Sequence, residues 1–411
     1  MLYYRFIPLC ILCVLFYNRN RCFAAGEETA QALWASAACS VLLKFKTRQV
    51  QYAEGAVYTR PITELPKALV KDGKPVFGTF AGHPMRLDIR GVKNPLGPMP
   101  LPTFITNLRI KSRLSFFFSL DEYIGCIDFF DAKIFGFAEV NFWHTGTKQR
   151  FTYRSVMGPR KRFVPHKLNA AATSSLKKSR YIRISWDRDH DRLSVIFNLS
   201  GNRVRPSANA AMIAHFSDNS CAELTSVIPS PTSRRCSACT VVALPVHGAI
   251  TLVPHHEHPK TMKDTEGFAF LDINRTYMRF RTHGEFVTAF GMVGQKQVWF
   301  RIAASSQDAV DTESYNSNVL FFEGATTPLP PVVITHPYGI MNKWIIQDTE
   351  NMIDLTFTPL SESLHKLSIF VLRTQYHTIY GTFEGTLLTA DGEKISFKAL
   401  PGLTKKYLIR L

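Results

Sequence analysis

The sequence predicts an all-β protein made of two packed antiparallel domains of the β-sandwich or lipocalin-like barrel type. Three observations support this fold class: apolar and polar residues alternate along many short segments, turn residues separate these segments at regular intervals, and long helical periods are few. The 411 residues are 45% apolar and 12% aromatic. Such a chain can bury a large core, and its length favours two domains.

Residues 1–25 resemble a signal peptide. A short basic start, Met1–Arg5, precedes the apolar run Phe6–Tyr17, and Cys22–Ala24 offers small residues where a signal peptidase cuts. Two arginines follow the apolar run, so an anchor through residues 6–17 stays an alternative. We therefore expect an exported protein, periplasmic or secreted or membrane-anchored. The protein would be cytoplasmic if the start residue is misassigned.

The segments after the apolar run are taken in chain order. Residues 26–50 are expected to form a loosely tied segment with one or more helical turns. Ile134–Trp143 alternates strictly, which predicts a half-buried strand with a second, aromatic face. Ile182–Trp186 and Leu193–Leu199 alternate in the same way and flank the polar turn Asp187–Arg192, so they predict a β-hairpin.

The second half of the chain has the same pattern. Two further hairpins are predicted: Phe286–Met292 with Gln297–Ala303 around Val293–Lys296, and Thr386–Leu388 with Lys394–Lys398 around Asp391-Gly392. The clearest candidate for a linker is the Ser/Pro-rich stretch Pro229–Ser233. We therefore divide the chain near residue 230, into an N-terminal β domain at 51–230 and a C-terminal β domain at 231–411.

The stretch Gln307–Thr358 combines several kinds of segment within a short length. An acidic and amide-rich loop comes first, an apolar run follows, and the proline run Pro328–Pro331 leads to an alternating strand. A chain has this composition where one β-element passes to the next across the mouth or edge of a sheet. The stretch therefore predicts a crossing, but it predicts no reaction.

The formal net charge of +17 permits an anionic partner. Lys and Arg are spread along the whole chain, which favours a basic soluble surface. The basic run Arg160–Arg183 lacks any nucleic-acid-binding motif, and an exported protein meets no nucleic acid. We predict no nucleic-acid partner, and expect this run to be a solvated loop or a peripheral contact with an anionic membrane surface. The sequence does not set the oligomeric state.

Two groups of residues have the spacing of metal ligands. Cys236-Ser-Ala-Cys239 lacks the second pair of a zinc ribbon, and on a strand two residues three apart point to opposite faces. His255, His256 and His258 lie between prolines in a loop, where adjacent side chains diverge. The chain also lacks the glycine-rich phosphate loop, the Gly-x-Ser-x-Gly elbow and the His-Glu-x-x-His helix. We predict no metal and no cofactor.

Seven segments carry a family resemblance: Val227–Ser230, Arg234–Cys236, Leu244–Ile250, Leu271-Asp272 with Arg275, Tyr315–Asn318, Pro328–Pro331 and Ile353–Pro359. Together they resemble a bacterial family of domains of unknown function, number 2804 in its series, over residues 65–411. That family is similar to the tandem lipocalin-like β-barrels of the carotenoid-hydratase and AttH-like group. The resemblance implies the same fold as the strand pattern and, since the family has no established reaction, it implies no activity.

The chain departs from the family pattern at three places. Gly284-Glu-Phe286 stands where the family has a Trp-x-Trp pair, and Ser317 stands where it has a glutamate before the loop asparagine. An early Lys-x-Trp signature is replaced by Ile110–Ser115. If these residues form the family's site, this chain has lost two rings and a polar group, which affects a shared catalytic activity more than a binding role.

Two classes of function are compatible with these observations, and a structural envelope protein is a further alternative. The first is a binding protein that encloses an apolar or amphipathic small molecule in a β-barrel or cleft. The second is a hydratase or isomerase acting on prenyl-type chains, in which an acid protonates a double bond before water adds. A carboxylate that faces a cavity would favour the enzyme.

We place the candidate site in the second domain. Asp272 is the candidate catalytic acid, and Arg275 is expected to hold it. The predicted ligand-binding residues are Arg275, Tyr315, Asn318 and Trp344, with the Trp344 ring packing on an apolar body and Asn318 and Arg275 binding a polar head. These side chains are candidates because they interrupt strongly apolar strands.

Overall fold

Strands dominate the part of the chain that the computed structural model describes: residues 58, 60–97, 101–158, 163–254, 263–369 and 372–410. These residues belong to one compact unit, residues 57–411. The predicted signal peptide at 1–25, the segment at 26–50, the start of the basic run at 160–162 and the histidines at 255–258 lie outside the described residues. One short helix, α3 (Thr103–Leu108), and a two-stranded ribbon, β2 (Val70–Lys71) with β3 (Lys74–Pro75), are described beside two large sheets.

The first large sheet joins 13 of the described strands. They are β1 (Ile62–Thr63), β4 (Gly78–Ala81), β5 (Ile110–Leu120), β6 (Tyr123–Asp131), β7 (Gly136–His144), β8 (Arg150–Met157), β9 (Ala170–Lys177), β10 (Arg180–Asp187), β11 (Arg192–Leu199), β12 (Ser207–Ala214), β13 (Ala222–Pro229), β14 (Cys236–Val253) and β15 (Thr265–Tyr277). Their main order is β8-β7-β6-β5-β15-β14-β12-β11-β10-β9, and β13, which pairs with β14, carries β4 and β1.

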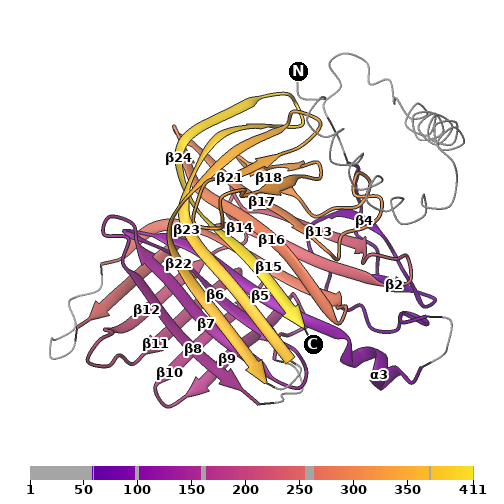
Figure 1. Ribbon diagram of the computed structural model, residues 1–411, viewed down its shortest axis with the longest axis horizontal. Helices are drawn as coiled ribbons and strands as arrows, with labels where there is room; N and C mark the ends of the chain where they lie inside the picture. Colours follow the sequence, from indigo (N-terminus) through magenta and orange to yellow (C-terminus); the bar gives the residue numbers. More distant parts are fainter. Residues whose placement is uncertain are drawn as a thin grey trace, which may run out of the picture. The chain divides into compact units, whose positions relative to one another are not determined.

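This sheet is a nearly closed barrel, because β8 and β9, the two ends of the main order, also contact each other (Figure 1). The side chains that alternate inward are large and apolar, and they fill the barrel: Phe116, Phe118, Phe129, Phe142 and Phe197 are all fully buried. The Phe142 ring is stacked on the rings of Tyr153 and Phe197. The interior is therefore a packed aromatic core.

The second large sheet has nine described strands in the order β19-β18-β17-β16-β24-β23-β22-β21-β20. They are β16 (Arg281–Val293), β17 (Lys296–Ser305), β18 (Val319–Phe322), β19 (Ala325–Pro328), β20 (Val333–Thr335), β21 (Trp344–Gln347), β22 (Ile353–Ile369), β23 (Leu372–Leu388) and β24 (Lys394–Arg410). The edge strands β19 and β20 follow each other directly in the chain.

The short connection between β19 and β20 requires the second sheet to curve. A flat nine-stranded sheet would separate its edges by roughly 38 Å. The chain from Pro328 to Val333 can span at most about 18 Å. The sheet therefore curls into a half-barrel. The predicted crossing within Gln307–Thr358 is confirmed, since the proline run carries the chain from one edge of this sheet to the other.

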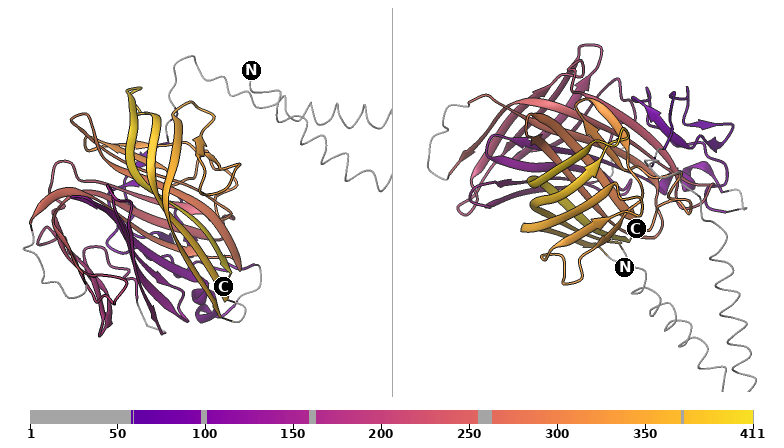
Figure 2. Two further views of the ribbon diagram at one scale, coloured as in Figure 1. Left: turned by 60° about the vertical axis from the view of Figure 1, so that its left-hand side comes forward. Right: turned by 90° about the horizontal axis from the view of Figure 1, so that it is seen from above.

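The two sheets pack face to face through a second aromatic cluster (Figure 2). Phe117 of β5 and Phe270 of β15 contribute from the outer face of the barrel, and Phe286, Phe290 and Trp299 contribute from the second sheet. The rings of Phe117 and Phe286 are stacked with centroids 5.4 Å apart. The outer face of β5 and β15 is thus buried, which explains why these strands are apolar on both faces over part of their length.

The predicted fold class is confirmed: the structure is all-β, with two packed antiparallel sheets. The hairpins predicted around Asp187–Arg192, Val293–Lys296 and Asp391-Gly392 are present as β10–β11, β16–β17 and β23–β24. The strand predicted at Ile134–Trp143 is β7, although both of its faces are buried and not one alone.

The division predicted near residue 230 does not coincide with the division between the sheets. Pro229–Ser233 belongs to the connection between β13 and β14, which pair with each other inside the first sheet. The chain passes from the first sheet to the second between Tyr277 and Arg281. Serine and proline favour a hairpin turn as much as a linker, so composition alone placed the boundary wrongly.

Candidate functional site

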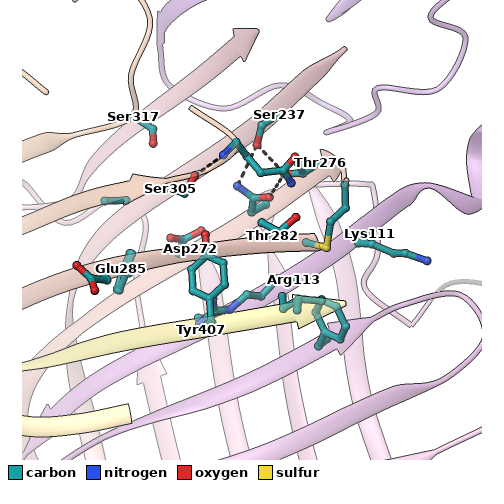
Figure 3. Close-up of a pocket in the computed structure, with 18 of the residues that line it drawn as sticks. Lys111, Arg113, Ser237, Asp272, Thr276, Thr282, Glu285, Ser305, Ser317 and Tyr407 are labelled. Carbon is teal, nitrogen blue, oxygen red and sulfur yellow. Dashed lines mark hydrogen bonds between the residues drawn. The ribbon is translucent and has the colours of Figure 1, made fainter. Parts of the chain in front are cut away.

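A cavity of about 120 Å³ lies between the two sheets. Figure 3 shows that its wall combines charged, hydroxylic and aromatic side chains from both sheets. The lining residues are Lys111, Ser112, Arg113, Ser115, Phe117, Phe130, Ile228, Ser237, Asp272, Asn274, Thr276, Met278, Thr282, Glu285, Phe286, Arg301, Ala303, Ser305, Gln307, Asp308, Ser317, Tyr376, Tyr407 and Ile409.

Strand β15 shows how the sequence produces this wall. Its residues alternate between the barrel interior and the second sheet. Toward the second sheet, the aromatic residues Phe268 and Phe270 are followed by Asp272, Asn274 and Thr276. The last two belong to a hydrogen-bonded group in which Thr276 Oγ1 donates to Asn274 Oδ1 at 2.6 Å. The contact between the sheets therefore changes from apolar to polar along one strand, and the cavity lies in the polar part.

Asp272 and Arg301 form a buried ion pair between the sheets at the cavity wall. Arg301 Nε of β17 donates to Asp272 Oδ2 at 2.9 Å, and Asp272 and Arg301 are 8% and 5% exposed. The guanidinium also donates to the carbonyl and hydroxyl oxygens of Ser317, at 2.9 and 2.7 Å. Burial opposes the charge of Arg301, yet the adjacent Cys239 and Asp272 raise its pKa above the ordinary value of an arginine.

Asp308 is a second carboxyl group at this cavity. It accepts hydrogen bonds from the backbone N–H of Ser305 at 2.7 Å and from the Ser305 hydroxyl at 2.8 Å. Burial raises the pKa of Asp308 above its ordinary value, although these hydrogen bonds and the charge of Arg301 act in the opposite direction. Tyr407 makes a hydrogen bond with the same Ser305, and burial raises the pKa of the Tyr407 phenol. Asp308 therefore retains its proton to a higher pH than an ordinary aspartic acid does.

Three polar atoms of the lining are buried without a hydrogen-bond partner among the described residues. They are Thr282 Oγ1, Gln307 Oε1 and the Tyr376 hydroxyl. Buried polar groups in proteins are nearly always hydrogen-bonded, because burying one unpaired is costly. Three such groups around one cavity indicate a place where a ligand with a polar group can bind.

The structure gives Asp272 a different partner from the predicted one. The expectation that Arg275 holds Asp272 is wrong, since the two residues are three apart on β15 and so point to opposite faces. Arg275 points into the barrel, where it donates to Ser112 Oγ at 3.1 Å and to the Val164 carbonyl at 2.8 Å. Burial lowers the pKa of Arg275 to about 10.

The cavity lining does not include Tyr315, Asn318 or Trp344. The Tyr315 ring meets the Phe77 ring edge to face at 5.9 Å. Asn318 is buried and fixes its loop, since its Oδ1 accepts from the Ala303 N–H and its Nδ2 donates to the Pro330 carbonyl, both at 2.9 Å. Trp344 is fully buried in the core of the second sheet. Of the residues predicted for the site, the structure brings Asp272 alone to the cavity wall.

Sequence reasoning did not single out Arg301, Asp308, Tyr376 or Tyr407. Two features of the sequence could have pointed to the residues that line the cavity. Asp308 lies at the start of the stretch Gln307–Thr358, and all three places where the chain departs from the family pattern supply lining residues.

One of these departures has a direct steric meaning. A Cβ atom at Gly284 would lie 2.5 Å from the Tyr407 hydroxyl and 2.7 Å from Ser305 Cβ. The glycine therefore leaves the room that Tyr407 occupies, and a side chain as large as tryptophan could not be placed there without displacing that phenol.

Cys236 and Cys239 point to opposite sides of β14, as predicted. Cys236 packs in the barrel core and Cys239 packs between the sheets. Within the described residues, no group of three or more His, Cys, Asp or Glu side chains has the arrangement of a metal site. The same part of the chain has no helix that is long and apolar enough to cross a membrane.

Comparison with known families identifies the chain. The sequence model of the family described as "Domain of unknown function (DUF2804)" matches residues 60–410. The chain belongs to this family. The resemblance that the motifs indicated is thereby confirmed, and the DUF2804 match spans both sheets and the cavity between them. A search of curated proteins found no match.

Two solved structures resemble this DUF2804 protein. A protein assigned as AttH from Nitrosomonas europaea is 12% identical, with a TM-score of 0.46 over 76% of this chain and 97% of that chain. Kievitone hydratase from Nectria haematococca is 9% identical, with a TM-score of 0.40 over 73% of this chain and 88% of that chain.

Proposed function

We propose that the protein binds a small amphipathic molecule in the cavity between its two sheets. The observation that carries the proposal is the set of three buried, unpaired polar atoms, Thr282 Oγ1, Gln307 Oε1 and the Tyr376 hydroxyl, around one cavity. Phe117, Phe130 and other apolar lining residues supply the complementary apolar surface.

The volume limits the part of the ligand that the cavity can enclose. An apolar cavity of roughly 150 Å³ binds benzene. At about 120 Å³ this cavity has room for a ring or a short branched chain that carries one or two polar atoms. The barrel interior is filled by its own aromatic side chains, so the proposed binding place is the cavity between the sheets.

The proposal is tested by extracting the purified full-length protein with organic solvent and identifying the released molecules by mass spectrometry. Ala303 lines the cavity, and the adjacent Ala304 does not. We expect Ala303→Phe, which fills the cavity, to lower ligand recovery at least roughly tenfold, the loss expected for a binding site blocked by a side chain. Ala304→Phe is the matched control and should retain the ligand.

Equal recovery from both variants would place the ligand elsewhere. If the wild-type protein releases no molecule, phenol serves as a small hydroxylated ring probe in calorimetric titrations, with benzene as its counterpart without a hydroxyl group. The proposal requires wild-type protein to bind phenol more tightly than benzene, because the unpaired polar atoms favour a hydroxylated ligand. It also requires Ala303→Phe to abolish that binding.

A second candidate function is hydration or isomerisation of a prenyl-type ligand in the same cavity. Asp308 favours it, because a carboxyl group with a raised pKa at the cavity wall can donate a proton to a double bond. Under this candidate Asp308 takes the role that the sequence assigned to Asp272. Recovery of an alkene together with its hydrated product would favour the enzyme over the binding protein.

A further inference from the structure

A second cavity, of about 420 Å³, opens beside β8 and is strongly basic. Its lining residues are Gln149, Arg150, Phe151, Thr152, Arg154, Arg180, Val204, Arg205, Pro206 and Leu364. Four of these are arginines, and none is acidic. The cavity shares no lining residue with the cavity between the sheets.

The positive charge of this second cavity is largely uncompensated. Arg154 pairs with Glu139, with Nε 2.9 Å from Oε2. Arg150, Arg180 and Arg205 form no ion pair with a carboxylate of the described residues. Three like charges around one cavity repel each other, and an anion placed among them removes that repulsion.

The four guanidinium groups are held in place by the backbone. Each donates one hydrogen bond to a carbonyl group: Arg150 to Glu362, Arg154 to Leu364, Arg180 to Arg154 and Arg205 to Thr152. The Arg205 guanidinium also lies over the Tyr153 ring, 4.5 Å from its centroid. Groups fixed in this way lose little conformational entropy when a ligand binds.

A purely structural role accounts for only part of this arrangement. Arg180 and Arg205 donate to carbonyl groups of β8, the end strand of the sheet, and so satisfy groups that no neighbouring strand pairs. One N–H from each arginine suffices for that purpose. The Nε atoms of Arg180 and Arg205 are buried without a hydrogen-bond partner among the described residues. These unpaired donors are what an anionic ligand would bind.

We propose that this cavity binds a phosphate group. A guanidinium presents its N–H groups in a planar fork that matches two oxygens of a phosphate, and several such forks can hold one tetrahedral anion. The phosphate can be free or can belong to a lipid headgroup, since the chemistry of recognition is the same. This site is independent of the cavity between the sheets and of the function proposed for it.

The test is calorimetric titration of the full chain with inorganic phosphate, at an ionic strength held constant with chloride. We expect saturable binding by the wild-type protein, and a dissociation constant roughly tenfold higher for Arg180→Gln and for Arg205→Gln, the loss of one charge-assisted contact. Arg203→Gln is the matched control. Like Arg205, Arg203 lies in the segment that precedes β12, but it is exposed and does not line the cavity. It should leave the constant within about twofold of the wild-type value, as for a screened surface charge.

Two results would overturn the proposal. One is a titration in which phosphate gives no heat beyond that of dilution. The other is an equal loss of phosphate affinity in Arg203→Gln and Arg205→Gln, because that would indicate general attraction to a basic surface. If the glutamine variants do not fold, Arg205→Lys keeps the charge and a donor for Thr152, and it must still weaken phosphate binding.

Co-sedimentation with phosphatidylcholine vesicles, with or without phosphatidic acid, distinguishes a lipid headgroup from free phosphate. Binding to the phosphatidic acid vesicles that inorganic phosphate displaces indicates a lipid headgroup, and binding of free phosphate without sedimentation indicates a soluble ligand.

Discussion

Lys111 is a charged residue in a place that disfavours charge. It is 6% exposed, it lines the cavity between the sheets, and its Nζ donates to the carbonyl oxygens of Leu108 at 2.8 Å and Ala132 at 2.6 Å. Burial, together with the charge of Arg109, lowers the pKa of Lys111 to about 8. In the unfolded chain a lysine keeps its proton to about pH 10.4.

This difference predicts how Lys111 affects the pH dependence of stability. Between pH 8 and 10 the unfolded chain binds more protons at this residue than the folded chain, so its contribution to the free energy of unfolding rises with pH. Lys111→Met removes that rise. Urea denaturation at pH 7 and pH 10 should therefore show the wild type gaining stability relative to Lys111→Met at the higher pH. Lys398→Met, at an exposed lysine of β24, is the control and should show no such gain. An equal difference between wild type and Lys111→Met at both pH values would contradict the prediction.

The charged residues also show what the sequence could and could not predict about the site. Asp272 was identifiable because it interrupts an apolar strand. Its partner Arg301 was not, since the two are joined only when the second sheet packs on the first. Arg275 could have been rejected from the sequence alone, because the alternation applied to Cys236 and Cys239 applies equally to two residues three apart on β15.

At the level of elements, β22, β23 and β24 are long strands that need a local break in their register. The pairing of β23 with β24 shifts between Phe383 and Gly385. Gly385 has φ of +136°, and a Cβ atom there would lie 2.0 Å from the Asp354 carbonyl oxygen. The irregularity increases the bend of the sheet and requires glycine at this residue.

We predict that Gly385→Ala lowers the free energy of unfolding by about 2–4 kcal/mol, through backbone strain and the clash with Asp354. Gly294→Ala is the control. Gly294 also has a positive φ, of +65°, but nothing lies within 4 Å of the added Cβ, so a loss of about 1 kcal/mol from strain alone is expected. Denaturant titrations measure both losses, and equal losses would mean that the contact with Asp354 contributes nothing.

Strands and tight hairpins were predictable because their signals are local. Alternation over a few residues and the dipeptide Asp391-Gly392 specify β-structure without reference to the rest of the chain. Strand lengths were less predictable, and β24 extends to Arg410, well beyond the predicted end at Lys398. Its later residues, such as Lys405, are polar but face the other sheet. Their polarity therefore suggested that the strand ends, whereas packing against the other sheet allows β24 to continue.

For the molecule as a whole, a second buried ion pair joins the sheets. Lys405 Nζ of β24 lies 2.7 Å from both carboxylate oxygens of Asp128 on β6, and Ser115 donates a further hydrogen bond to Asp128. Although burial alone would raise it, Lys405 and Arg113 hold the pKa of Asp128 well below its usual range. The pair thus links β24 of the second sheet to β6 of the first through buried charges.

Removing one partner of this pair should be costly. Asp128→Asn leaves Lys405 buried without its counter-charge, and a loss of about 3–5 kcal/mol in the free energy of unfolding is expected. The double variant Asp128→Leu with Lys405→Met replaces both charges by apolar groups. It should recover the part of that loss that comes from the unpaired Lys405, while Arg113, 3.3 Å from Asp128 in the wild type, still lacks its carboxylate. Urea denaturation of the single and double variants provides the comparison. A double variant no more stable than Asp128→Asn would show that the pair itself stabilises the fold.

The arrangement of the two sheets was the least predictable feature. The first sheet takes strands from both sides of residue 230, and β14 pairs with β13 along its first half and with β12 along its second. Pairings between distant strands depend on side-chain packing over the whole core, so the sequence pattern of a single segment does not predict them. The cavity between the sheets shares this property, since its wall comes from nine strands and from loops far apart in the sequence.

The short edge strands of the second sheet affect the solubility of the protein. A long exposed edge offers unpaired N–H and C=O groups on which a strand of another molecule can add, which leads to aggregation. Here the edges are β19 and β20, which span only Ala325–Pro328 and Val333–Thr335, and a proline ends the first. Few backbone groups are then available for such pairing. The same proline run that bends the sheet into a half-barrel thereby helps to keep neighbouring molecules from joining their sheets edge to edge.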